Sequence, residues 1–168
     1  TFSFYPGKNL GAYGDAGAAI TNSKQYADFM ASFRNHGRAA GKKYEHDMRG
    51  MNERMDELQA AVLTAKLKHL EAWTAARRSH AARYKQLLAG SAVLVPAENP
   101  AAKHVWHLFV IQAADRDALA RKLAAADIQT GIHYPIPLHL QPALAWLGYE
   151  RGDFPVAEAA ASRLLSLP

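Results

Sequence analysis

The chain has 168 residues, of which 49% are hydrophobic and 21% charged, with a formal net charge of +5 and no cysteine. The missing cysteines exclude a disulfide framework and a thiolate metal site. No apolar run reaches membrane-spanning length and no signal peptide opens the chain, so we expect a cytoplasmic protein without a membrane partner. Lysines and arginines are scattered, with no basic cluster interleaved with aromatics, and we therefore expect no nucleic-acid partner.

A short strand and a helix are the first expected elements. Residues 16–21 are small and apolar, which favours a strand. Ser23 suits the N-cap of a helix that runs to about Phe33 and closes near Gly37. Residues 38–50, which contain two glycines and two consecutive lysines, are typical of a mobile loop.

One long helical pattern without proline or glycine runs from Asn52 to about Leu88. Acidic residues gather in its early turns and basic residues in its late turns, which matches the helix dipole. Gly90 is expected to end it. Because such a helix is too long for half of one compact core, we expect it to bridge two structural units.

The pattern becomes α+β beyond Pro96. Residues 105–112 form an apolar, β-rich run that predicts a strand. Asp115 is expected to cap a helix whose apolar face includes Leu119 and Leu123.

The last quarter of the chain predicts shorter elements. A strand is expected over residues 129–132. Two prolines within residues 133–139 prevent regular ladder pairing, which indicates an exposed, irregular turn. Short helices are expected over residues 141–147 and 155–165.

Lys8 is the residue with the clearest chemical potential, because it lies in a run punctuated by glycines. Glycine permits positive φ and close backbone packing that a Cβ would block. A lysine that attacks a carbonyl must be neutral and correctly aimed, which such a backbone favours. Ser3 offers a hydroxyl for an anionic group such as a phosphate. From the residues alone, a structural loop with a solvated charge remains the alternative. The glycines are Gly7, Gly11, Gly14 and Gly17.

Residues 3–15, Ser-Phe-Tyr-Pro-Gly-Lys-Asn-Leu-Gly-Ala-Tyr-Gly-Asp, resemble the cofactor-lysine motif of the DegT/DnrJ/EryC1/StrS aminotransferases, pyridoxal-phosphate enzymes of nucleotide-sugar biosynthesis. The resemblance covers nearly the whole chain. It implies the α/β class and the fold-type I aminotransferase architecture. Four further segments follow in the family's order: Arg34–Gly37, Gly50–Ala61, His104–His107 and Gly131–His139.

This resemblance implies a division into three parts. Residues 1–51 would be the end of the large cofactor domain with its Schiff-base lysine loop, residues 52–90 the long linking helix, and residues 91–168 an incomplete small carboxyl-terminal α+β domain. We expect a fragment that is inactive alone, with most of the large domain before it and a short piece after it. The acidic partner of the cofactor ring is expected upstream.

The resemblance also implies the chemistry. Lys8 would bind pyridoxal 5'-phosphate as an imine and act as the proton carrier, in a transamination from glutamate to a keto group of a dTDP- or UDP-linked sugar. Ser3 and Asn52 would contact the cofactor phosphate, with Asn52 reaching it from the neighbouring subunit of a homodimer that shares its active sites. Asn52 also stands where a helix N-cap is expected. The alternative function is a non-catalytic, sugar-responsive regulatory protein of the same fold, in which the lysine would be expected to be lost.

Five residues are candidates for substrate contact, and each has a structural alternative. Tyr5 lies three residues before the amine, where either packing or substrate contact is open, and Lys43 is either a solvated charge or a phosphate contact. His133 and Tyr134 stand at an exposed strand end, where ligand groups are commonly presented. For His139 two roles are open: it either starts a helix or contacts a ligand.

The remaining histidines are not assigned to chemistry. His104 and His107 flank Trp106 on an expected strand and are assigned structural roles. Neither a His-Glu-x-x-His pattern nor a third ligand of suitable spacing accompanies them, so we expect no metal.

Overall fold

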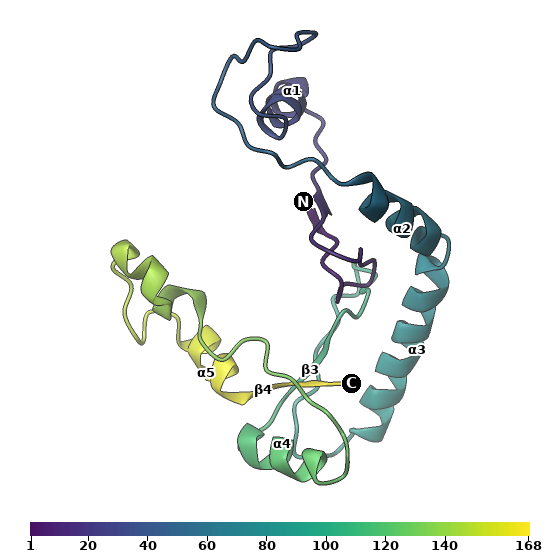
Figure 1. The fold of residues 1–168 in the computed structure, drawn as a ribbon. Helices are drawn as coiled ribbons and strands as arrows, with labels where there is room; N and C mark the ends of the chain where they lie inside the picture. The colour runs from purple at the N-terminus through teal and green to yellow at the C-terminus, as the bar shows by residue number, and fades with distance from the viewer. The chain divides into compact units, whose positions relative to one another are not determined.

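The computed structural model describes all 168 residues, which form two compact units, residues 1–73 and 74–168 (Figure 1). The first unit contains β1 (Phe2–Ser3), β2 (Gly17–Ala18), α1 (Lys24–Phe33), α2 (Glu57–Leu67) and the start of α3 (Leu70–Leu87). The second contains the rest of α3, β3 (Phe109–Gln112), α4 (Arg116–Ala124), the 3-10 helices η1 (Leu138–Leu140) and η2 (Pro142–Leu147), α5 (Pro155–Arg163) and β4 (Leu164–Leu167). None of the helices combines the length and the apolar character needed to cross a bilayer.

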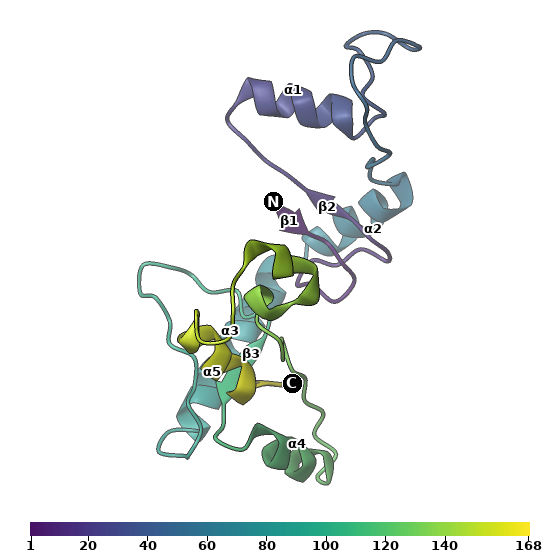
Figure 2. The same cartoon turned by 90° about the vertical axis from the view of Figure 1, so that its left-hand side faces the viewer.

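The strands β1 and β2 form an antiparallel pair at the start of the first unit (Figure 2). Phe2 lies opposite Ala18, and Ser3 opposite Gly17. A Cβ on Gly17 would lie 2.9 Å from the carbonyl oxygen of Phe2, so the close approach of the two strands requires glycine. The strand predicted over residues 16–21 is thus confirmed only at Gly17 and Ala18, near its start.

Helix α1 has the boundaries that its local sequence predicts. Ser23 accepts a hydrogen bond from the backbone N–H of Tyr26 at 3.4 Å, as an N-cap does. At the other end, the N–H of Gly37 donates to the carbonyl of Ser32 at 2.9 Å, and Gly37 has a φ of 70°. The chain leaves the helix in a conformation that glycine adopts without strain.

Residues 38–50 form an excursion whose ends are held together. An antiparallel bridge pairs Arg38 with His46, and a second pairs Asn35 with Asn52. These two bridges hold the start and the end of the segment next to each other. The mobility expected for it stays a prediction.

The continuous helix predicted from Asn52 to Leu88 is wrong in two places. The helix begins only at Glu57, because the residues around Asn52 pair with the segment after α1 in extended conformation. The chain is also interrupted after Leu67, where the two residues Lys68 and His69 form a turn before α3. Neither contains glycine or proline, so the sequence carries no propensity signal for this break.

The core of the second unit is built around β3 and β4, which pair antiparallel with Ile111 opposite Leu165. These two side chains are 2% and 0% exposed. Trp106, Phe109 and Ala81 of α3 complete the buried cluster. The ring of Tyr84 stacks on Phe109 at a centroid distance of 4.9 Å and so joins α3 to the sheet.

Three predictions for this unit need correction. The strand expected from residue 105 starts at Phe109, because Trp106 has a φ of 45° and interrupts the extended chain. The helix expected to reach Leu165 ends at Arg163, because pairing with β3 draws the following residues into β4. The strand expected over residues 129–132 is reduced to one bridge, between Gly131 and Ser166.

Two helix predictions for this unit hold. Asp115 caps α4 by accepting the backbone N–H of Ala118 at 2.8 Å. The helix expected over residues 141–147 is present as the 3-10 helix η2, which ends at Gly148 with a φ of 75°.

Candidate functional site

Lys8 lies in a turn whose two ends touch. A Cβ on Gly11 would lie 2.3 Å from the carbonyl oxygen of Pro6, so the two backbones are in direct contact and only glycine fits. Within the turn, the N–H of Lys8 donates to the carbonyl of Tyr5 at 2.9 Å. Gly11 is buried and Lys8 is half-buried. The backbone that presents the amine is therefore closed and tightly packed.

Ser3 and Lys8 are joined through the backbone of Tyr5. Its N–H donates to the Ser3 hydroxyl oxygen at 3.4 Å, and its carbonyl accepts from Lys8. The hydroxyl acts here as an acceptor, so its own proton is available to a phosphate oxygen. No hydrogen bond or ion pair engages the Lys8 ammonium. An unengaged amine and a hydroxyl in one loop fit an aldehyde cofactor that carries a phosphate.

The other predicted site residues of the first unit lie on its surface. Tyr5 is 59% exposed, so it is not part of a packed core in this unit. Asn52 is exposed, and its backbone forms a bridge with that of Asn35. The N-cap position of α2 is taken by Asp56, four residues after Asn52. The N-cap interpretation of Asn52 is therefore wrong, and its contact with the cofactor phosphate stays a prediction. Lys43 is exposed, with its ammonium 5.2 Å from the ring centroid of Tyr44.

In the second unit, His133 is attached to the core strand β4. Its Nδ1 lies 2.9 Å from the hydroxyl oxygen of Ser166. Tyr134, which follows across a cis peptide bond, is 70% exposed, and its ring meets the His133 ring edge-on at 5.5 Å. His133 is thus anchored to β4, whereas Tyr134 is accessible to a ligand.

His139 is engaged with an acidic residue. Its Nε2 lies 3.0 Å from Oε1 of Glu158, and the two side chains are only 8% and 13% exposed. The backbone N–H of Gly152 donates to the same oxygen at 2.8 Å and holds the pKa of the Glu158 carboxyl below its usual range. Partial burial opposes this effect, and the His139 ring reinforces it. The contact ties η1 to α5, and a ligand contact by His139 stays a prediction.

A mostly apolar cavity of about 660 Å³ brings two of the predicted residues together. Tyr134 and His139 both line it, whereas His133 does not. The rest of its wall comes from the proline-containing segment and from α5, including Pro137, Gln141, Phe154 and Ala161. A planar or apolar group fits this lining better than a charged one.

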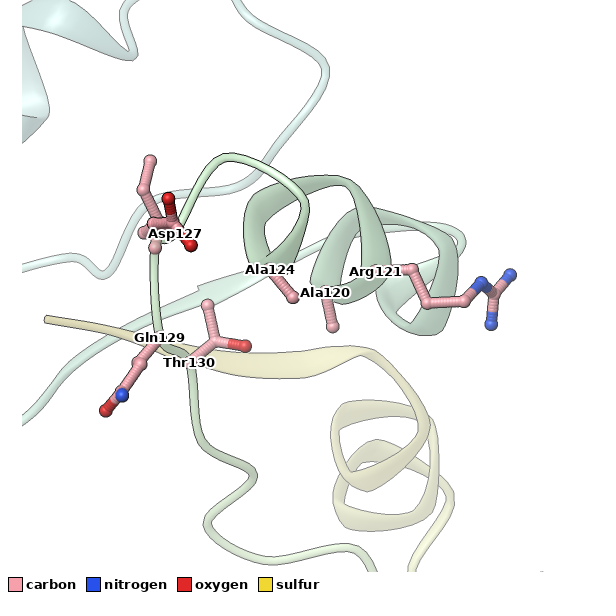
Figure 3. Close-up of a pocket in the computed structure, with 7 residues that line it drawn as sticks. Ala120, Arg121, Ala124, Asp127, Gln129 and Thr130 are labelled. Atoms are coloured by element: carbon pink, nitrogen blue, oxygen red, sulfur yellow. The ribbon is translucent and has the colours of Figure 1, made fainter.

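A second cavity, of about 740 Å³, lies at the end of α4 and contains none of the predicted residues (Figure 3). Ala120 and Ala124 lie on the side of α4 that is nearer to Thr130, while the side chain of Arg121 extends away from it. It is not part of the candidate site.

Several residues that touch the site were not found from the sequence. On α2, Gln59 accepts the N–H of Tyr13 at 2.8 Å, and Lys66 donates to the carbonyl of Gly11 at 2.5 Å. Ser166 bonds His133 and Glu158 bonds His139, two of the predicted substrate contacts. The only available signal was the seven-residue spacing of Gln59 and Lys66, which places them on one helix face.

A model of the DegT/DnrJ/EryC1/StrS aminotransferase family matches residues 1–168. The chain therefore belongs to this family, and the family predicted from the motifs is confirmed.

Among its relatives, the chain is 50% identical to the erythromycin biosynthesis sensory transduction protein EryC1 of Saccharopolyspora erythraea, over 99% of this chain and 45% of that protein. It is 45% identical to the dTDP-3-amino-3,4,6-trideoxy-alpha-D-glucose transaminase of Streptomyces venezuelae, over 99% of this chain and 44% of that protein. The solved structure of S. venezuelae DesV in complex with a ketimine intermediate superposes with a TM-score of 0.94 at 45% identity, covering 99% of this chain and 45% of that one. The predicted fold is thereby confirmed, and the chain spans about 45% of the length of these relatives.

Proposed function

We propose that the whole protein is a pyridoxal-phosphate-dependent aminotransferase that moves an amino group from glutamate to the keto group of a dTDP- or UDP-linked sugar. The observation that carries this proposal is the Lys8 turn, closed at Pro6 and Gly11, with an unengaged amine and the Ser3 hydroxyl in one loop. The S. venezuelae relative, named as a dTDP-sugar transaminase, supports the substrate class.

The family's aminotransferases use pyridoxal phosphate. In this chain Lys8 would hold it, and Ser3 would donate a hydrogen bond to its phosphate. When bound, the cofactor supplies an electron sink for the carbanion that forms at the amino donor's α-carbon. Lys8 would carry a proton between that α-carbon and the cofactor, which requires a neutral, correctly aimed nitrogen.

A regulatory function is the second candidate, because the S. erythraea relative is named a sensory transduction protein. Such a protein would bind a nucleotide sugar without turnover. Lys8 favours the enzyme, because binding alone does not need an amine on a closed turn.

Absorbance spectroscopy of the whole protein loaded with pyridoxal phosphate separates the two functions. For the enzyme, glutamate should bleach the cofactor band, and a nucleotide-linked keto sugar should restore it. A spectrum that glutamate leaves unchanged, in a protein that still binds the nucleotide sugar, would favour the regulator.

We further propose that the protein is a homodimer in which Asn52 of one subunit reaches the cofactor phosphate near Ser3 and Lys8 of the other. Lys8→Ala and Asn52→Ala parents should each be inactive. Mixed dimers of the two should regain part of the activity, because one of their two sites contains both intact residues. Activity after verified subunit exchange is the measurement. No recovery would show that Asn52 acts only within its own chain.

Tyr134 and His133 are proposed to select the sugar. Tyr134→Phe should weaken use of the keto sugar about tenfold, the effect of one lost hydrogen bond of about 1.4 kcal/mol. His133→Ala should act in the same direction. The glutamate half-reaction should be nearly unchanged, as measured by single-turnover absorbance.

The matched control for Tyr134→Phe is Tyr26→Phe, at a 63% exposed tyrosine on α1, which should change neither half-reaction. Equal losses in both half-reactions of Tyr134→Phe would mean that Tyr134 supports the cofactor or the fold instead of the sugar.

A further inference from the structure

We propose that Gln59 and Lys66, both on α2, are positioning residues for Lys8. This inference rests on the proposed function, because it assigns them to the placement of the reacting amine. Gln59 Oε1 accepts the N–H of Tyr13 at 2.8 Å, and Lys66 Nζ donates to the carbonyl oxygen of Gly11 at 2.5 Å. Both contacts are made with backbone groups of the loop that follows Lys8, so they hold the loop independently of its side chains.

The contact at Gly11 reaches Lys8 through the closed turn. Gly11 and Pro6 are in direct backbone contact on either side of Lys8. A displacement of Gly11 therefore moves both ends of the turn and the lysine between them. Ala12, between the two attachment points, is 1% exposed and donates its N–H to the carbonyl of Phe4 at 2.8 Å. The loop is thus stiff enough to transmit the position of α2 to the amine.

The two attachments also fix orientation. Gln59 and Lys66 are seven residues apart on α2, which separates them by about 10 Å along one helix face. Two points of attachment prevent the loop from pivoting about either one. The Lys66 contact is charge-assisted and therefore stronger than a neutral hydrogen bond. Its ammonium also lies 5.8 Å from the ring centroid of Tyr13, an additional favourable contact.

This restraint matters because a catalytic group must be held within about 0.5 Å of its productive position. Lys8 serves both half-reactions. Loosening its loop should therefore lower the rate of both, while the binding of glutamate and of the sugar, which other residues carry out, should change little.

The test uses the whole protein carrying Gln59→Ala or Lys66→Met. In the cofactor-free protein, amide hydrogen exchange of residues 8–14 should become about tenfold faster, as expected for one lost hydrogen bond. In the loaded protein, kcat should fall by a similar factor in both half-reactions, with KM for both substrates unchanged. The conservative variants Gln59→Glu, which keeps an acceptor, and Lys66→Arg, which keeps a donor, should restore most of the protection and rate.

Lys68→Met is the matched control, because Lys68 is exposed in the turn after α2, only two residues from Lys66. It should change neither exchange nor rate. Unchanged exchange in residues 8–14 of the Gln59→Ala and Lys66→Met variants would overturn the inference. So would an equal increase in α1, which would indicate general loosening of the unit. Because exchange is read without cofactor or turnover, it decides the inference even if the whole protein proves not to be a transaminase.

Discussion

Replacement of Lys8 by alanine in the whole protein is expected to lower the rate of amino transfer by about 1,000-fold. The closed turn presents this amine and no other, and its removal deletes the group that moves the proton. Lys8→Arg should be nearly as impaired, because a guanidinium stays protonated and cannot act as a base. Single-turnover absorbance with glutamate measures both variants.

Borohydride reduction followed by peptide mapping provides the companion measurement. The cofactor should be trapped on Lys8. Lys42→Ala is the control, because Lys42 lies on the exposed excursion after α1 and pairs with Glu45 at 3.2 Å. Its removal should leave the trapping on Lys8 unchanged. A label found on Lys42 or Lys43, with Lys8 unmodified, would contradict the assignment.

Leu165→Ala is expected to lower the free energy of unfolding by about 3 kcal/mol. Leu165 is fully buried between β3, α3 and the rings of the core, and its truncation leaves a cavity that the paired strands cannot collapse around. Urea denaturation of the whole protein, followed by a probe in residues 74–168 such as Trp106 fluorescence, measures the change.

The control for Leu165→Ala is Val156→Ala on α5, where the side chain is 83% exposed. Its effect should stay within about 0.5 kcal/mol. A similar loss for both substitutions would mean that Val156 is covered in the whole protein, and no loss for Leu165→Ala would mean that β4 is not part of the core.

Elements defined by local signals were predicted correctly from the sequence. Ser23 and Asp115 each cap a helix through a side-chain bond to a backbone N–H three residues later, a contact that the sequence alone can specify. Strand β4 was missed because Leu164 and Leu165 continue the apolar face of α5, and only pairing with β3 makes them extended. The late start of α2 has the same origin, a partner segment distant in the sequence.

The residues of the candidate site also fall into two groups, those that a local motif predicts and those that only tertiary packing brings to the site. Lys8 and Ser3 could be found because their motif is contiguous, and the backbone of Tyr5 connects them within three residues on either side. Gln59 and Lys66 lie about fifty residues further along the chain, and no local pattern predicts which loop a helix face will touch. Such contacts depend on tertiary packing, and a single sequence does not show which distant segments pack together.

The pairing of β4 limits where the chain tolerates changes in length. Leu165 fills the core while the adjacent Ser166 bonds His133, so one extra residue before β4 would put Leu164 in the place of Leu165 and Leu165 in the place of Ser166. A single-residue insertion between α5 and β4 would therefore keep a leucine in the core but remove the hydroxyl that bonds His133, a candidate sugar contact. The turn from Gly148 to Gly152 has positive φ at both glycines and open space around them. Inserted tags or fluorescent labels belong beside Gly148, away from the Gly152 N–H that binds Glu158 and from the junction that follows α5.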